Sequence, residues 1–189
     1  MKSVDTKTAT ALLRDGEILI GTLDGYPALI CDARNSEAVA KLRKLKKRPP
    51  EKGFSVLIDS DARLNRYTTD VPPIAWDIID TATEAIILVL PKGKGLSKEV
   101  LADDGTVAVR ICKDAEERKL VQAANGPLAC TALINAEGLP AAGTDEASPE
   151  VLDEVGYVLS LPTANRHYPL RKIPVIKLGP AGEVAVLRE

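Results

Sequence analysis

Two patterns of apolar and polar positions alternate along this chain and together predict an α/β protein. Short runs of apolar, often β-branched residues predict strands. We expect strands at 17–21, 28–31, 54–58, 85–90, 106–111, 128–133, 157–161, 173–178 and 184–187. Apolar residues at three- and four-residue spacing, flanked by capping residues, glycine or proline, predict helices. We expect helices at 6–14, 35–48, 59–67, 74–81, 114–124 and 148–155.

The alternation of strands and helices predicts a sheet covered by helices. The run AIILVL at 85–90 is continuously apolar, which favours a central strand buried on both faces. Trp76 is expected to anchor the core. The chain is long enough for a substantial core, and we predict a single domain over residues 1–189.

The predicted helix at 35–48 ends in a concentration of positive charge. Seven cations surround one acid, Glu51, and they are Lys41, Arg43, Lys44, Lys46, Lys47, Arg48 and Lys52. Pro49 and Pro50 stop a helix, so Arg48 is expected to be its last residue. Cations at a helix end complement the helix dipole and can simply be solvated. Alternatively, Lys46 and Arg48 form a cradle for a phosphate or a carboxylate.

Composition limits where an anion can bind. The net charge is -2 and the pI is near 5.6, so the whole molecule does not attract nucleic acid and any anion site must be a local patch. No apolar run reaches the roughly 20 residues of a membrane span, and the first residues lack a signal peptide's apolar centre. We therefore expect a cytoplasmic protein without membrane contact. The lone His167 is interpreted as a surface loop residue.

Cysteine usage and one strand arginine complete the candidate chemistry. Cys31, Cys112 and Cys130 are far apart and odd in number, so we expect buried, reduced thiols and no metal bound by the protein. Arg110 lies inside the predicted strand 106–111. An arginine there should face solvent or meet an anion, because unpaired burial is costly.

Several segments resemble the YrdC/YciO family of threonylcarbamoyl-AMP synthase-like proteins. They are EILIG, ICD, LKKRPPEKGF, TVAVRI and NGPLACTALINAEGLP, and the resemblance spans about residues 8 to 160. It implies a twisted, mixed parallel and antiparallel sheet with a concave basic surface. It also implies conversion of ATP, threonine and bicarbonate to threonylcarbamoyl-AMP and pyrophosphate with Mg²⁺, in tRNA threonylcarbamoyladenosine formation. Members have also been regarded as RNA-binding proteins.

The resemblance assigns roles to particular cations. LKKRPPEKG is similar to the family's Lys-x-Arg motif, which places Lys46 and Arg48 as basic ligands of a nucleotide or carboxylate, with Lys52 nearby. Arg110 corresponds to the family's strand arginine and either reaches the same cavity or forms a structural salt bridge. Positioned cations of this kind stabilise charge that develops on phosphate oxygens.

The chain departs from the family at three motifs. The proline-threonine and tyrosine-glycine-leucine segment is replaced at 21–27, the serine-alanine-asparagine motif at 131–135, and the tryptophan-proline-glycine-proline segment at 81–85. Only Thr22, Thr131 and Asn135 remain as possible polar site groups. The sequence thus leaves three hypotheses: a nucleotide- or RNA-binding protein with degenerate synthase motifs, an active synthase that uses substitute residues, or a non-catalytic partner-binding domain.

Overall fold

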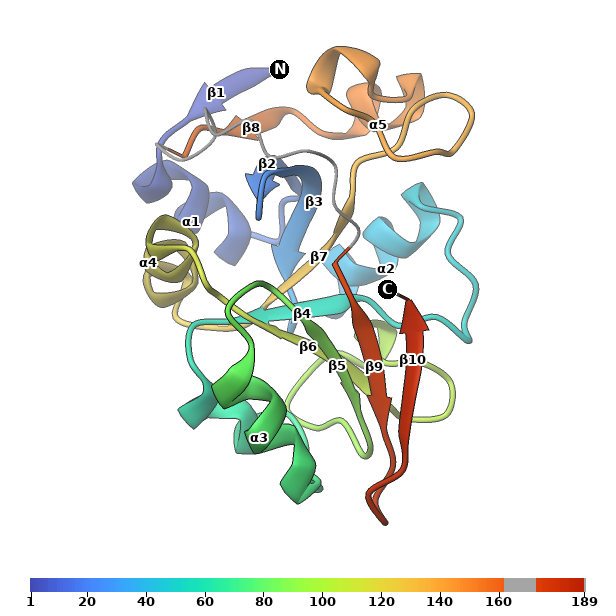
Figure 1. Cartoon of the computed structure of the whole chain (residues 1–189). Helices are drawn as coiled ribbons and strands as arrows, with labels where there is room; N and C mark the ends of the chain where they lie inside the picture. The colour runs from blue at the N-terminus through green and yellow to red at the C-terminus, as the bar shows by residue number, and fades with distance from the viewer. Residues whose placement is uncertain (162–172, 189) are drawn as a thin grey trace.

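The computed structural model describes residues 1–161 and 173–188, which form one mixed sheet with helices on both faces (Figure 1). The strands are β1 (Lys2–Val4), β2 (Leu19–Leu23), β3 (Tyr26–Asp32), β4 (Ser55–Ile58), β5 (Ile87–Leu90), β6 (Val107–Ile111), β7 (Leu128–Ala132), β8 (Tyr157–Leu159), β9 (Val175–Leu178) and β10 (Val184–Arg188). The helices are α1 (Thr6–Arg14), α2 (Ser36–Leu45), α3 (Pro73–Thr81), α4 (Ala115–Ala124) and α5 (Pro149–Glu154), with 3₁₀ helices η1 (Asp61–Arg66), η2 (Lys98–Val100) and η3 (Thr144–Glu146).

The strand order is β1-β8-β2-β3-β7-β4-β6-β5-β9-β10. β4 runs parallel to β6, whereas β7 runs antiparallel to both of its neighbours, β3 and β4. The mixed α/β sheet implied by the resemblance is therefore confirmed. The segment 85–90 forms an interior strand, but β5 lies third from the β10 edge and not at the centre.

Two apolar layers hold the helices against the sheet. The layer under α2, α3 and α5 contains Phe54 and is the larger one, and Trp76 packs against it while partly buried. The layer under α1 and α4 contains Leu57 and Leu120. In Figure 1, α1 and α4 lie together on one side of the upper strands and α2 lies on the other side.

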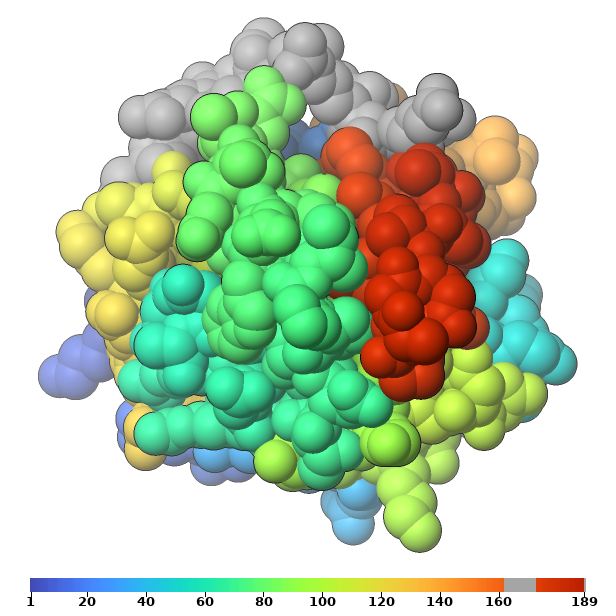
Figure 2. All heavy atoms as spheres, turned by 60° about the horizontal axis from the view of Figure 1, so that its bottom comes forward, coloured from blue at the N-terminus to red at the C-terminus, as the bar shows by residue number. Residues whose placement is uncertain are grey.

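One row of side chains on the α1/α4 face is only partly covered. It consists of Ser55, Ala108, Val89 and Lys177, which are paired in register across β4, β6, β5 and β9. We call this row the open strip. Arg110 lies in the next row of the same face, because it pairs with Leu57. Figure 2 shows the β9–β10 hairpin, which borders the strip, on an outer face of the molecule.

The end of α2 differs from the prediction. The helix ends at Leu45 and not at Arg48, because Lys47 turns into the left-handed region with a φ of 46°. The backbone N–H of Arg48 then donates to the carbonyl of Arg43, and that of Lys47 donates to Lys44, at 3.0 Å each. This is the Schellman motif, which usually has glycine at the position of Lys47. The early turn leaves Lys46 and Arg48 outside the helix.

Replacing Lys47 by glycine should raise the free energy of unfolding by about 0.5–1 kcal/mol, because a side chain costs about 1–2 kcal/mol in the left-handed region and glycine's greater unfolded-state freedom offsets part of that gain. The exposed Lys47–Glu150 contact of 3.8 Å contributes little. Urea denaturation measures the change. Lys44→Gly, within α2, is the matched control and should lower stability by about 1 kcal/mol. Equal losses in both variants would contradict the explanation.

Other differences concern short elements. β1 was not predicted, since three residues with one buried side chain carry almost no periodic signal. The segment 59–67 forms the 3₁₀ helix η1. Cys31, Cys112 and Cys130 are buried and free, as expected. His167 lies outside the described residues. Within residues 1–161 and 173–188, no helix is long and apolar enough to cross a membrane.

Candidate functional site: a basic corner and a buried arginine

Lys46 is the C-cap of α2 and extends toward the end of β7. Its Nζ donates a hydrogen bond of 2.7 Å to the carbonyl of Ala132, the last residue of that strand. The side chain is partly buried. Burial, with a smaller effect from the positive charge of Arg48, lowers the pKa of Lys46 to about 8. Lys46 is therefore a cation in surroundings that disfavour its charge.

Arg48 lies beside the start of β4. Its Nε and Nη2 donate to the carbonyl of Gly53 at 2.9 and 2.5 Å, and its guanidinium stacks 4.9 Å from the centroid of the Phe54 ring. Burial is the largest cause that lowers the pKa of Arg48, followed by the charges of Arg43 and Arg188. The sequence motif did not indicate Arg188. It comes from β10, and only the folded sheet brings its charge close to Arg48.

We call Lys46, Arg48 and Arg188 the basic corner. Neighbouring cations of the same segment have acidic partners: Lys41 pairs with Glu154 at 3.2 Å and Arg43 with Glu99 at 3.5 Å. Within the described residues, Lys46 and Arg48 form no ion pair; their hydrogen bonds go to backbone carbonyls. Two partly buried like charges without a carboxylate form a site that favours an anion.

The remaining predicted polar groups differ in position. The exposed Lys52 offers its carbonyl to Arg48 at 3.2 Å and lies at the rim of the corner. Thr131 lies one residue before Ala132, on the face that carries Leu29. Thr22 pairs with Pro27, whose carbonyl accepts from Leu133 just beyond β7. The structure therefore brings Thr22, Thr131 and the basic corner to one end of the sheet.

Asn135 is engaged in its own loop. Its side-chain oxygen accepts hydrogen bonds from the backbone N–H groups of Glu137 and Leu139, at 3.1 and 2.9 Å. Asparagine commonly stabilises a turn in this way. This contact gives the side-chain oxygen of Asn135 a structural task in shaping the loop after β7.

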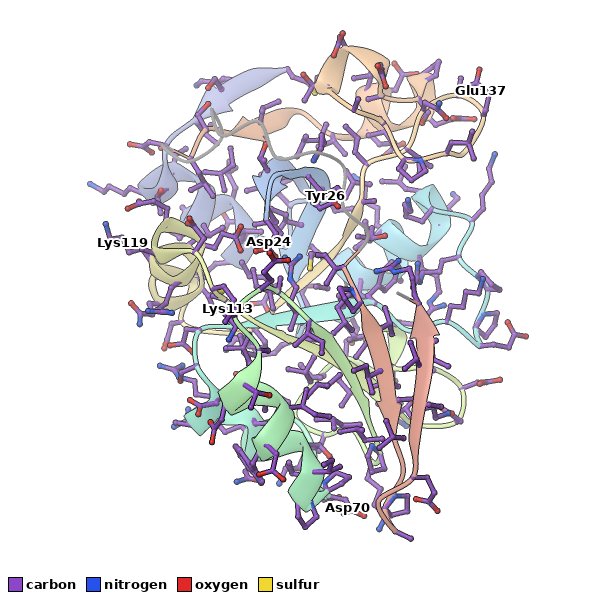
Figure 3. All side chains as sticks on the ribbon, in the orientation of Figure 1. Asp24, Tyr26, Asp70, Lys113, Lys119 and Glu137 are labelled. Carbon is purple, nitrogen blue, oxygen red and sulfur yellow. The ribbon has the colours of Figure 1, made fainter. Side chains whose placement is uncertain are left out.

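Arg110 is separate from the basic corner. It lies on the α1/α4 face and its side chain is only 4% exposed. Its Nη1 pairs with Oδ2 of Asp24 at 2.8 Å. Of the two roles left open by the sequence, the salt bridge is the contact present. Asp24 comes from the turn between β2 and β3, and Figure 3 shows it near the middle of the molecule.

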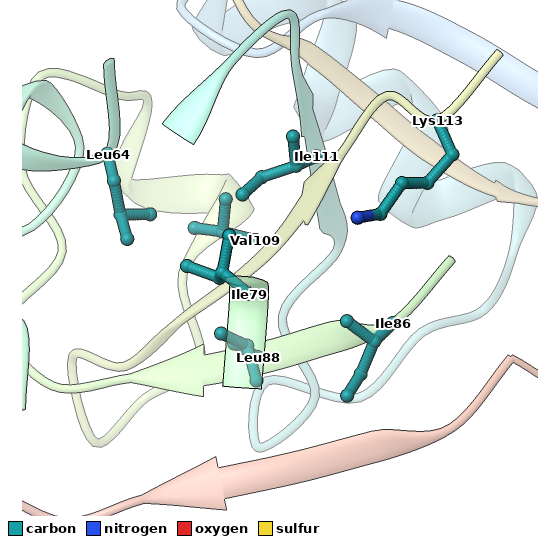
Figure 4. Close-up of a pocket in the computed structure, with 7 residues that line it drawn as sticks. All are labelled: Leu64, Ile79, Ile86, Leu88, Val109, Ile111 and Lys113. Atoms are coloured by element: carbon teal, nitrogen blue, oxygen red, sulfur yellow. The ribbon is translucent and has the colours of Figure 1, made fainter. Parts of the chain in front are cut away.

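An apolar pocket lies on the other face of the sheet. Its lining consists of Leu64, Ile79, Ile86, Leu88, Val109, Ile111 and Lys113 (Figure 4). Leu88 and Val109 belong to the layer under α3, opposite the open strip. The Nζ of Lys113 donates to the carbonyl of Ala82 at 2.6 Å. This pocket is thus distinct from both cation sites.

Comparison with known proteins defines the class and then the family. The P. abyssi Sua5 structure, a complex with L-threonine, superposes with a TM-score of 0.80 over 100% of this chain and 57% of that chain, at 17% identity. The chain therefore has the fold of the YrdC-like proteins and spans little more than half of Sua5. A family model named Sua5_yciO_yrdC and described as "Telomere recombination" matches residues 11–189. The chain belongs to this family, which confirms the resemblance seen in its motifs.

Two further relatives extend the comparison. The threonylcarbamoyl-AMP synthase of Pseudoalteromonas translucida is 27% identical over 164 residues, covering 85% of this chain and 88% of that protein. Full-length HypF in a phosphate- and nucleotide-bound form is 26% identical with a TM-score of 0.76, and the match covers 97% of this chain but only 28% of HypF.

Proposed function

We propose that this protein binds a nucleotide, with its phosphates held by Lys46 and Arg48 at the basic corner. The observation that carries the proposal is the pair of partly buried cations without an acidic partner in the described chain. A phosphate supplies the missing negative charge, with Lys46 acting as a point charge and Arg48 as a planar donor. Mg²⁺ would accompany a triphosphate as part of the ligand.

The polar groups at the same sheet end would complete this site. Thr22 and Thr131 lie where strands β2, β3 and β7 meet the basic corner, and neither hydroxyl makes a hydrogen bond within the described residues. Both hydroxyls are therefore available to a ligand. Lys52, at the rim, would add an exposed charge that salt screens strongly. The HypF structure, which contains phosphate and nucleotide, supports this choice of ligand over RNA.

A second candidate function is threonylcarbamoyl-AMP synthesis. It is favoured by the relatives that bear this name over most of their length. Ala132 and Leu133 occupy the region of the family's serine-alanine-asparagine motif, and they contribute no polar side chain. A site that keeps its cations but loses orienting groups binds without turning over rapidly, because orientation contributes several powers of ten in rate.

One experiment separates the two functions. Purified protein is titrated with MgATP by calorimetry, and then incubated with ATP, bicarbonate, labelled threonine and Mg²⁺. We expect binding in the micromolar to millimolar range and no release of pyrophosphate above background. Turnover would establish the synthase function, and absence of any binding would exclude the proposal. A parallel titration with a short RNA that bound more tightly than MgATP would also overturn it.

A further inference from the structure

The turn between β2 and β3 places a carboxylate on Arg110. Asp24 and Gly25 both have positive φ angles, 47° and 79°, as a two-residue type I′ hairpin requires. From this tip, Asp24 Oδ2 contacts Arg110 Nη1 at 2.8 Å, and the Asp24 backbone N–H donates to Oε1 of Glu117 on α4. The tip therefore connects a strand and a helix that are distant from it in the sequence.

The cluster leaves donors and acceptors unused. Arg110 and Glu117 are only 4% and 2% exposed. In the described part of the chain, Nε and Nη2 of Arg110 and Oε2 of Glu117 are buried without a hydrogen-bond partner. Nε–H and Nη2–H form one edge of the guanidinium, and this edge matches the two oxygens of a carboxylate or phosphate. Asp24 satisfies a different nitrogen, so a bidentate donor pair remains unfilled.

The charge balance of the cluster is unfavourable. Two carboxylates, Asp24 and Glu117, face a single guanidinium, and the other titratable groups nearby are Cys112, Cys130 and Asp114. Burial, with a smaller contribution from Asp24, raises the pKa of Glu117 to about 7. Asp24 is thus held on Arg110 next to a competing negative charge, which weakens its hold. An external anion would meet the same guanidinium from the side of the open strip, whose row adjoins that of Arg110.

We propose that Arg110 is an oxyanion-binding group of the open-strip face and that Asp24 occupies it from within the chain as a built-in competitor. A carboxylate or phosphate from outside binds Arg110 fully only when the hairpin tip releases it. This inference deepens the proposed function and rests on it, since it adds a second anion subsite that is closed in the resting protein. Asp24 is then the residue that determines which anions the site accepts.

The test removes only the charge of Asp24. Asparagine tolerates the left-handed conformation, so Asp24→Asn keeps the turn while leaving Arg110 unpaired. Thermal midpoints of the full chain are measured in sodium chloride, sodium formate and sodium phosphate at equal ionic strength. We expect a lower midpoint for Asp24→Asn in chloride and a recovery of about 3 °C or more in formate, in phosphate or in both. The wild type should show no difference between formate and chloride.

Matched controls identify the guanidinium as the binding group. The double variant Asp24→Asn/Arg110→Met should lose the anion-specific recovery. Asp104→Asn, which breaks the exposed 2.8 Å pair with Lys177, should show none. Equal anion effects on wild type and Asp24→Asn would overturn the inference, as would recovery that persists without Arg110. If Asp24→Asn does not fold in chloride, its refolding yield in formate against chloride gives the same decision.

The outcome is independent of nucleotide binding. Anion-specific recovery of Asp24→Asn together with no MgATP binding by the wild type would reject the proposed function and keep the Arg110 subsite. MgATP binding that depends on Lys46, without any recovery by formate or phosphate, would keep the proposed function and reject Asp24 as a competitor.

Discussion

Replacing Lys46 by methionine is expected to weaken MgATP binding by roughly 10- to 100-fold, since a hydrogen bond to a charged group contributes about 1.5–3 kcal/mol. Methionine keeps most of the length of the side chain but supplies neither the charge nor the donor that now contacts Ala132. Lys46→Arg should retain most of the affinity. Calorimetric titration at fixed ionic strength measures each dissociation constant.

The adjacent lysine is the matched control for this prediction. Lys47 carries the same charge one residue along, but it is exposed and lies 3.8 Å from Glu150. Lys47→Met should therefore change the dissociation constant less than about threefold, because exposed charges act through a screened medium. If both methionine variants weakened binding to the same extent, general electrostatic attraction would explain the affinity and the basic corner would not be the site.

The pH dependence gives a second check on Lys46. The free protein loses the Lys46 proton near pH 8, whereas a bound phosphate favours the protonated amine. Wild-type affinity should accordingly fall as the pH rises from about 7 to 9. Lys46→Arg stays charged over this range and should not show the fall. An equally steep fall in the arginine variant would assign the titration to another group.

Much of the fold follows from local signals in the sequence. Asn35 and Asp114 cap α2 and α4 through their side-chain oxygens, as their positions before apolar stripes predict. The end of α2 was wrong because proline sets the latest possible end of a helix, and Lys47 turned the chain three residues earlier without the expected glycine. Sheet order has no local signal, since it depends on which strands meet after the chain collapses.

The same division applies to the candidate site. Lys46 and Arg48 belong to one short motif, so the sequence could single them out together. Arg188 reaches the basic corner from the other end of the chain, and no spacing indicated it. Glu117 did leave a signal: it falls on the apolar stripe of α4 with Leu120 and Ala124, and an acid in such a position marks a buried charge. Its partner, in the Asp-Gly turn, was identifiable as a turn residue but not as a contact.

Stability should decrease as the pH rises from 5 to 8, and Glu117→Gln should remove most of this decrease. The folded protein raises the pKa of Glu117 from 4.5 to about 7, so it holds the proton more tightly than the unfolded chain. The stabilisation is complete below pH 4.5 and is lost as the pH rises through about 7, for a total of about 3 kcal/mol at about 1.4 kcal/mol per pKa unit. Glutamine cannot ionise, and its oxygen can still accept from the Asp24 N–H.

Urea denaturation at pH 5, 6, 7 and 8 measures this effect as a difference between two profiles. Glu117→Gln should match the wild type at pH 5 within about 1 kcal/mol and exceed it at pH 8 by about 2–3 kcal/mol. Glu116→Gln is the control one residue earlier, where the carboxylate meets the exposed Lys119 at 2.6 Å, and its profile should run parallel to the wild type. Parallel profiles for Glu117→Gln as well would mean that Glu117 does not carry the titration, and the strain between Asp24 and Glu117 around Arg110 would then have to be relieved by another group.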